Sequence, residues 1–166
     1  MSQPDVLPDV LTPRLKVVFC GTAAGSVSAA RHAYYAHPQN QFWRTLAAIG
    51  LTPRQLQPEE YQQLVAYGVG LTDLAKHHAG MDSDIPQAGF DPAAFQAKMQ
   101  HYAPQVVAFT SKRTGQVYFK HPVTYGVQTE GIGAIRLFVL PSPSPAARGS
   151  WDVSYWQALA ALVHTL

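Results

Sequence analysis

The sequence predicts an α/β fold of three layers, α/β/α, with a short, mostly parallel central sheet of four or five strands. Four short apolar runs, each ending at or just before Gly, Thr, Ser or Pro, are typical of buried strands. Helical patterns lie between them, and strands that alternate with helices form parallel sheets that are covered on both faces. The expected strands are residues 15–21, 64–72, 105–111 and 134–140.

Helices are expected at residues 40–49, 58–67, 91–102 and 150–166. Gly50 follows the first of these segments, and glycine commonly ends a helix. Asp91 and Pro92 open the third, as an N-cap and a first-turn residue. Because the second segment overlaps the apolar run 64–72, helix and strand compete near residue 64. Residues 76–90 show no periodicity and are expected to form a surface loop.

The composition is that of a soluble globular protein. Of 166 residues, 47% are hydrophobic and 13% are charged, and the net charge of +2 does not by itself point to nucleic acid. Any affinity for phosphate must therefore come from a few local groups. No apolar stretch approaches the ~20 residues of a membrane span, and no signal peptide is evident. We expect a cytoplasmic monomer with a flexible N-terminal segment, residues 1–13, and one domain, residues 14–166.

No metal or cofactor is expected. Cys20 is the single cysteine and lies inside an apolar run, so a buried structural thiol is expected rather than a disulfide or a zinc site. Seven histidines are present, but His77 and His78 are adjacent and point apart on most backbones. No His-x-x-x-His pattern with a carboxylate accompanies them.

The candidate site lies beyond the carboxyl ends of the strands, where parallel sheets bind ligands. The first strand ends in a turn, residues 21–25, in which two glycines bracket small residues. Such a turn lets the backbone approach a flat or anionic ligand, although an ordinary strand-to-helix turn has the same composition. His37 precedes Pro38 and is expected to form a hydrogen bond within a turn rather than to act as a base.

Several motifs follow one another along the chain. They are residues 17–21 with the small-residue turn, Ala36-His37-Pro38 with Asn40 and Phe42-Trp43, residues 70–74, residues 109–112, and residues 139–148. In this order and spacing they resemble the mismatch-specific uracil-DNA glycosylases, which are close relatives of the thymine-DNA glycosylases. The resemblance extends from about residue 11 to the C-terminus. It implies a DNA-repair enzyme that flips uracil or a related mismatched or damaged pyrimidine out of DNA and hydrolyses its N-glycosidic bond, leaving an abasic site.

One position departs from the family pattern. The first motif of the family carries an asparagine that positions the attacking water, and Ala23 stands in its place here. Base release passes through an oxocarbenium-like state that a carboxylate near the sugar stabilises. Asp73 directly follows the run 64–72 and is predicted to be the catalytic residue, although a capping role is equally expected for an aspartate there. Asp82 and Asp84 are the alternatives.

The remaining roles are implied by the resemblance. Tyr35 matches the aromatic residue that stacks on the flipped base. Backbone groups around Thr22 and Tyr35 would bind the base edge, and Ala23 also belongs to the base-binding residues. The residues expected to contact DNA are Lys112, Ser142, Ser144, Ala146 and Arg148. In the family, a wedge of side chains fills the stack that the flipped base vacates. Alanines surround that position here, so weak discrimination of the opposite base is expected.

Two other functions remain open. The alanine at position 23 favours a catalytically silent binder of mismatched or damaged DNA. A hydrolase of free nucleosides could use the same pocket, but the serine-proline loop with Arg148 favours polymeric DNA.

Overall fold

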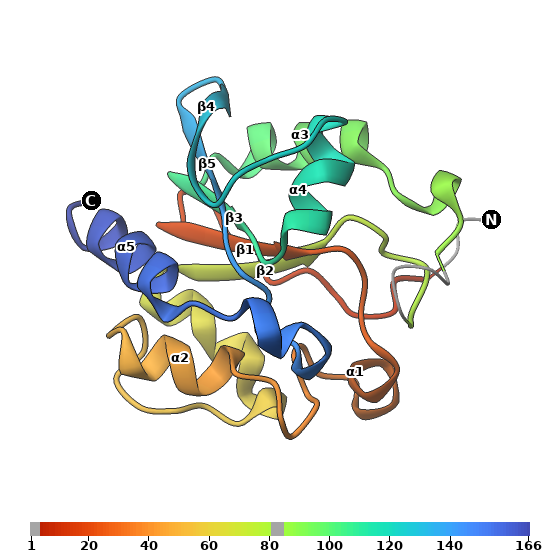
Figure 1. Ribbon diagram of the computed structural model, residues 1–166, viewed down its shortest axis with the longest axis horizontal. Helices are drawn as coiled ribbons and strands as arrows, with labels where there is room; N and C mark the ends of the chain where they lie inside the picture. Colours follow the sequence, from red (N-terminus) through yellow and green to blue (C-terminus); the bar gives the residue numbers. More distant parts are fainter. Residues whose placement is uncertain (1–3, 81–84) are drawn as a thin grey trace.

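Five strands form one sheet in the order β2-β1-β3-β5-β4, in a computed structural model that describes residues 4–80 and 85–166 (Figure 1). Neighbouring strands are parallel except β4, which lies antiparallel to β5 at the edge. The strands are β1 (Val17–Gly21), β2 (Val69–Asp73), β3 (Val106–Phe109), β4 (Gly126–Ile132) and β5 (Ile135–Val139). This arrangement confirms the predicted α/β class with a mostly parallel sheet.

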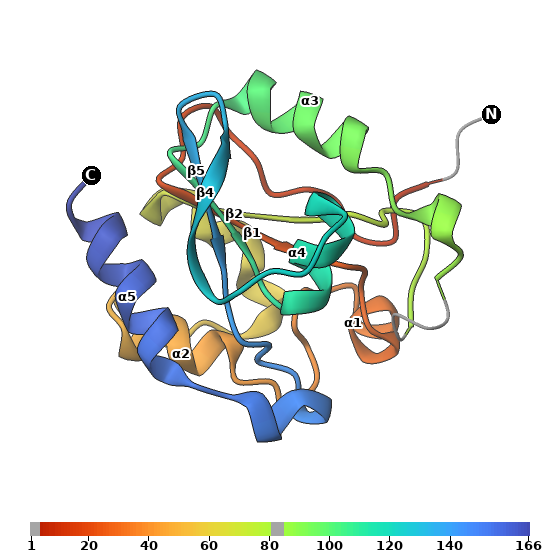
Figure 2. The same ribbon diagram turned by 45° about the horizontal axis from the view of Figure 1, so that its top comes forward.

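Helices cover both faces of the sheet, as the alternating apolar pattern requires. Below the sheet in Figure 1 lie α1 (Ser26–Arg31), α2 (Phe42–Ala48), the 3-10 segment η1 (Pro58–Tyr67) and α5 (Val153–His164). Above it lie α3 (Pro92–Tyr102) and α4 (Lys112–Phe119). Short 3-10 segments η3 (Gln87–Gly89) and η4 (Pro145–Ser150) complete the described elements. Figure 2 shows α1 and η4 on the same side of the molecule, after β1 and β5 respectively.

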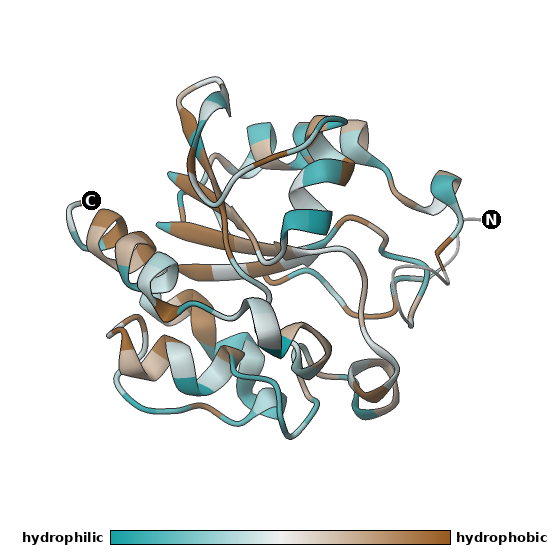
Figure 3. Ribbon diagram, viewed as in Figure 1, coloured by the Kyte–Doolittle hydropathy of each residue, from teal (hydrophilic) through white to brown (hydrophobic). Residues whose placement is uncertain are grey.

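Two hydrophobic clusters fill the spaces between the layers. Successive residues of a strand point to opposite faces, so β1 contributes Val17 and Phe19 to one cluster and Val18 and Cys20 to the other. Figure 3 shows these strands as the hydrophobic centre of the fold, with hydrophilic residues on the outer turns of the helices. Cys20 is fully buried, as expected.

The competition near residue 64 is resolved in favour of the helix. The segment η1 continues to Tyr67, Gly68 takes the left-handed conformation that ends it (φ 79°), and β2 begins only at Val69. The expected strand over residues 64–72 was therefore five residues too long at its start. Asp73 is the last residue of β2 rather than the first residue after it.

The strand β4 and the α-helices α1 and α4 have no counterpart among the expected segments. The strand β4 is mostly exposed and contains two glycines, so it lacks an apolar run. The helix α1 has only six residues. The helix α4 contains a glycine, but its N-cap Ser111, whose hydroxyl accepts from the Thr114 N–H, is a signal that the sequence carried.

The N-terminal segment packs against the domain. Leu7 and Val10 are buried in the first cluster, and Val10 forms an antiparallel bridge with Leu71 of β2. The Tyr34 hydroxyl donates to the Pro8 carbonyl at 2.9 Å. Residues 4–13 were expected to belong to a flexible segment, whereas their apolar side chains cover the edge of β2. We call residues 4–10 the N-terminal strap.

Candidate active site

A cavity of about 750 Å³ opens beyond the carboxyl ends of β1, β2 and β3. We call it the base cavity. Its wall combines residues 21–28 from the end of β1 onward, residues 110–111 and 113–114 after β3, and residues 142–147 after β5. Side chains from the N-terminal strap, the loop after α1 and β2 complete it. Of the predicted site residues, those that line it are Thr22, Ala23, Tyr35, Asp73, Ser142, Ser144 and Ala146. Lys112 and Arg148 are not in its wall.

Asp73 is a carboxylate enclosed by the sheet. The parallel register pairs it with Gly21. A β-carbon on Gly21 would lie 2.7 Å from Asp73 Oδ1, so the glycine leaves room for the acid. Asp73 is 7% exposed. Burial raises its pKa to about 6, Lys76 opposes the shift, and Asp9 adds to it. Near pH 7 the group is mainly a buried anion.

Tyr35 is held by contacts on one ring face and at its hydroxyl. Its ring stacks on Phe42, with ring centres 4.0 Å apart. Its hydroxyl lies 3.1 Å from Thr110 Oγ1, and since Thr110 donates to the Cys20 carbonyl, the tyrosine donates to Thr110. Burial raises the pKa of the phenol well above its ordinary value, with a further contribution from Asp73, so it stays protonated.

The backbone of Tyr35 is strained. Its φ is 51°, in the left-handed region that a bulky side chain rarely occupies. Of the other non-glycine residues with positive φ, Arg14 lies in the turn before β1, and His32, Ala103 and Lys120 each cap the end of a helix. Tyr35 has no such role. Strain of this kind persists where the surrounding structure fixes a residue for a purpose, and here it accompanies a ring in the wall of the base cavity.

The loop after β5 forms one rim of the base cavity. Ser142 Oγ accepts from the Ser144 N–H at 3.2 Å, and Ser144 Oγ accepts from the Ala146 N–H at 3.3 Å. Trp156 of α5 anchors the start of the loop, because its indole N–H donates to the Pro141 carbonyl. Within the described residues neither serine hydroxyl donates a hydrogen bond, so each retains a proton for a ligand.

The basic residues near this rim are placed differently from one another. Lys112 Nζ lies 4.4 Å from the ring centre of Tyr125, outside the base cavity. Its neighbour Arg113 lines the cavity instead. Arg148 lies on η4, and its guanidinium donates to Gln39 Oε1 at 3.3 Å.

Leu7 and Asn40 stand out among the lining residues that were not predicted as site residues. Leu7 belongs to the N-terminal strap, and only its apolar character in a polar segment could have suggested a buried role. Asn40 is a polar side chain in the wall of the cavity, in the same motif as His37. Its Oδ1 accepts from the Phe42 N–H, which leaves the amide hydrogens as donors. His37 Nδ1 accepts from the Gln39 N–H at 3.0 Å, which confirms the expected turn hydrogen bond.

A charged network lies beside Asp73. The two carboxylate oxygens of Asp9 bind Lys76 at 2.9 Å and Lys98 at 2.5 Å. The Thr72 hydroxyl also donates to Asp9 at 2.6 Å. Burial raises the pKa of Asp9, but the lysines and the hydroxyl together hold it below its ordinary value. The network fastens the strap to the end of β2 and sets the charge around Asp73.

The two loop alternatives to Asp73, Asp82 and Asp84, lie outside the described residues. Across residues 4–80 and 85–166, no group of three or more His, Cys, Asp or Glu side chains is arranged to hold a metal ion. In the same part of the chain, no helix has the length and apolar character that crossing a membrane requires.

The comparisons with known proteins agree with this geometry. A solution NMR structure from Methanosarcina acetivorans, named as a "putative Uracil DNA glycosylase", shares the fold with a TM-score of 0.71. Its sequence is 23% identical, and the similarity covers 99% of each chain. The profile of the Uracil DNA glycosylase superfamily matches residues 8–162. The match covers nearly the whole chain, so this protein belongs to the uracil DNA glycosylase superfamily.

Proposed function

We propose that this protein is a monomeric DNA glycosylase of the mismatch-specific uracil type. It draws uracil or a related damaged pyrimidine out of DNA into the base cavity and hydrolyses the N-glycosidic bond, leaving an abasic site. The observation that carries the proposal is that one cavity brings together the buried carboxylate of Asp73, the ring of Tyr35 and the serine loop. Membership of the superfamily supports the same reaction.

In this proposal Asp73 is the catalytic residue. Departure of the base leaves positive charge on the sugar, and a fixed carboxylate stabilises that charge without reorganising solvent. The same carboxylate can align the attacking water or accept its proton, and its pKa of about 6 suits proton transfer near neutral pH. Ala23 supplies only a methyl group, so residue 23 can contribute backbone groups but no side-chain hydrogen bond to the water.

Tyr35 and the first turn would hold the base. One face of the Tyr35 ring is covered by Phe42, and the other face is the surface on which a flipped base would stack. Backbone groups of Thr22 and Ala23 would contact the edge of the base. A methyl group at residue 23 leaves space beside that edge, so we expect tolerance of more than one base.

The rim would hold the DNA backbone. Ser142 and Ser144 have hydroxyl protons to donate to phosphates, which position the strand without reading its sequence. Arg148 and Lys112 would add charge at the edges of the interface, and Ala146 is too small to fill the gap that the flipped base leaves.

The test is the release of uracil from a duplex, measured as abasic sites that alkali converts into strand breaks. Wild type is compared with Asp73→Asn, which keeps the shape of the side chain and removes its charge, and with Asn40→Ser. The serine can still accept from the Phe42 N–H, so that variant tests the second polar side chain of the cavity with its turn preserved. We expect activity in wild type and in Asn40→Ser, and its loss in Asp73→Asn.

One observation favours a second function, a silent binder of damaged DNA. Ala23 leaves the first turn without the polar side chain that the family uses. That function predicts specific binding of uracil-containing duplex with no abasic sites for any lesion. Turnover of free deoxyuridine would indicate a nucleoside hydrolase instead.

A further inference from the structure

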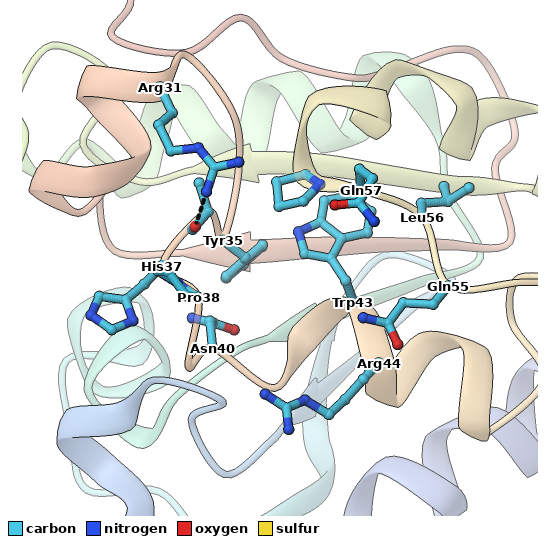
Figure 4. A pocket seen from close by; sticks show the side chains of 12 residues that line it. Arg31, Tyr35, His37, Pro38, Asn40, Trp43, Arg44, Gln55, Leu56 and Gln57 are labelled. Atoms are coloured by element: carbon cyan, nitrogen blue, oxygen red, sulfur yellow. Dashed lines mark hydrogen bonds between the residues drawn. The ribbon is translucent and has the colours of Figure 1, made fainter.

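A second cavity, of about 370 Å³, adjoins the base cavity (Figure 4). The two share Tyr35, His37 and Asn40 in their walls. The loop over residues 35–40 therefore separates them. The rest of the second cavity is formed by Arg31 at the end of α1, by Trp43 and Arg44 of α2, and by residues 55–58. None of these last residues has a role in the site described above.

The wall of the second cavity carries positive charge. Two arginines line it and no carboxylate does. Arg31 is already engaged, because it donates to the Ala36 carbonyl at 2.8 Å and pairs with Glu59. Arg44 is exposed, and its side chain makes no hydrogen bond or ion pair within the described residues. Figure 4 shows the two guanidinium groups on opposite sides of Trp43, with Arg44 below it in this view.

The groups in this cavity suit an anion better than a base. The ring of Trp43 is 3% exposed, and its N–H donates to the Tyr34 carbonyl, so it offers little surface for stacking. The available donors are the Arg44 guanidinium and the side chain of Gln55. A guanidinium binds two oxygens of a phosphate at once, which an ammonium cannot do.

We propose that the second cavity is a phosphodiester subsite for the DNA strand whose nucleotide enters the base cavity, with Arg44 as the group that binds the phosphate. The inference rests on the proposed function, because it needs DNA at the base cavity. The Gln41 N–H donates to the Pro143 carbonyl at 3.0 Å and joins the wall between the cavities to the serine loop. Phosphates held at Ser142 and Ser144 and at Arg44 would therefore lie along one continuous rim.

The test measures binding of a duplex that contains 2′-fluoro-2′-deoxyuridine, whose glycosidic bond resists hydrolysis, as a function of salt. Arg44→Gln is compared with Arg136→Gln, a matched loss of charge near the amino end of β5, opposite the cavities. One phosphate contact contributes about 0.9 to the slope of log K against log salt concentration for duplex DNA. We expect the slope to become less steep by about 0.9 in Arg44→Gln. It should stay at the wild-type value in Arg136→Gln. Equal melting temperatures of the variants and wild type exclude misfolding.

A second readout locates the phosphate. Neutral methylphosphonates replace the phosphates around the lesion one at a time. At one position the methylphosphonate should weaken binding by wild type but cause no further loss of binding by Arg44→Gln. Equal slopes for the two variants, or additive losses at every position, would overturn the subsite. If Arg44→Gln releases uracil and its salt slope equals that of wild type, the subsite is wrong and the proposed function stands. If wild type binds no DNA, both the subsite and the proposed function are wrong.

Discussion

The carboxylate of Asp73 occupies the space that a side chain on Gly21 would need. The two residues are paired across β1 and β2, and a β-carbon at residue 21 would meet Asp73 Oδ1 at 2.7 Å. Real β-carbons essentially never come so close to another heavy atom. The glycine at the end of the first strand thus allows the acid at the end of the second to stay inside the base cavity.

Gly21→Ala should therefore move the carboxylate. Overpacking of this kind destabilises a protein by about 1–3 kcal/mol, and the displaced acid should lower the rate of base release. Gly25→Ala is the control for stability, since a β-carbon there has open space around it. Urea unfolding and the abasic-site assay measure both effects. A Gly21→Ala protein with the stability and rate of wild type would contradict the close packing.

Asp73→Asn should stabilise the fold at alkaline pH. The pKa of Asp73 in the folded protein, about 6, lies above its ordinary value of 3.8. The buried charge therefore costs stability in full above about pH 6, by about 3 kcal/mol, and the cost disappears as the pH falls below 3.8. We expect a higher urea midpoint for the variant at pH 8 and a smaller difference at pH 4.5.

Asp91→Asn is the control for that measurement. Asp91 accepts from the Ala94 N–H at the exposed start of α3, and asparagine caps a helix as well as aspartate does. Its midpoint should follow that of wild type at both pH values. A lower midpoint for Asp73→Asn than for wild type at pH 8 would show that the carboxylate stabilises the fold.

Two variants should distinguish the contributions of the two contacts of Tyr35 to activity. Tyr35→Phe loses the hydrogen bond to Thr110 but keeps the ring on Phe42, whereas Tyr35→Ala removes the stacking surface. Stacking on a base contributes about 1–3 kcal/mol, so Tyr35→Ala should lower kcat/KM for a uracil duplex by about 5- to 150-fold. Tyr35→Phe should stay within a few-fold of wild type. Equal losses in both variants would contradict a stacking role.

The clamp on the N-terminal strap depends on Asp9. Asp9→Asn leaves Lys76 and Lys98 without their carboxylate, and we expect a loss of about 1–3 kcal/mol of unfolding free energy. Because the folded pKa of Asp9 is lowered, this stabilisation is present above 3.8 and disappears as the pH falls through the lower folded value. Asp5→Asn, in the exposed part of the same strap, is the control. Equal stabilities of the two variants at pH 7 would show that the clamp contributes nothing.

The sequence predicted the elements whose signals are local and apolar. The buried strands β1 and β3 are hydrophobic runs, β5 is one interrupted only by the exposed Arg136, and α3 opens with Asp91 and Pro92 as helices often do. It did not predict β4, whose stability comes from pairing with β5 rather than from its own composition. Nor did it place the strap, since Leu7 and Val10 are buried by contacts distant in sequence.

The candidate site also has parts that the sequence could predict and parts that it could not. The position of Asp73 beside Gly21 follows from parallel pairing of neighbouring strands, so the topology of the sheet could predict it. The separate positions of Lys112 and Arg113 depend on where α4 begins, which the sequence pattern did not resolve. The second cavity is formed by α1, α2 and residues 55–58 together, and no local sequence pattern predicts that these segments lie side by side.

The most direct test of the proposed mechanism is the single-turnover rate of abasic-site formation in a uracil duplex between pH 5 and 8. The carboxylate acts in its charged form, so the wild-type rate should fall on the acid side of about pH 6, in step with the pKa of Asp73. Asp73→Asn should lose most of the rate at every pH, and Asn40→Ser should keep the wild-type profile. A wild-type rate and pH profile in Asp73→Asn, with the loss in Asn40→Ser instead, would contradict the assignment and make Asn40 the catalytic residue.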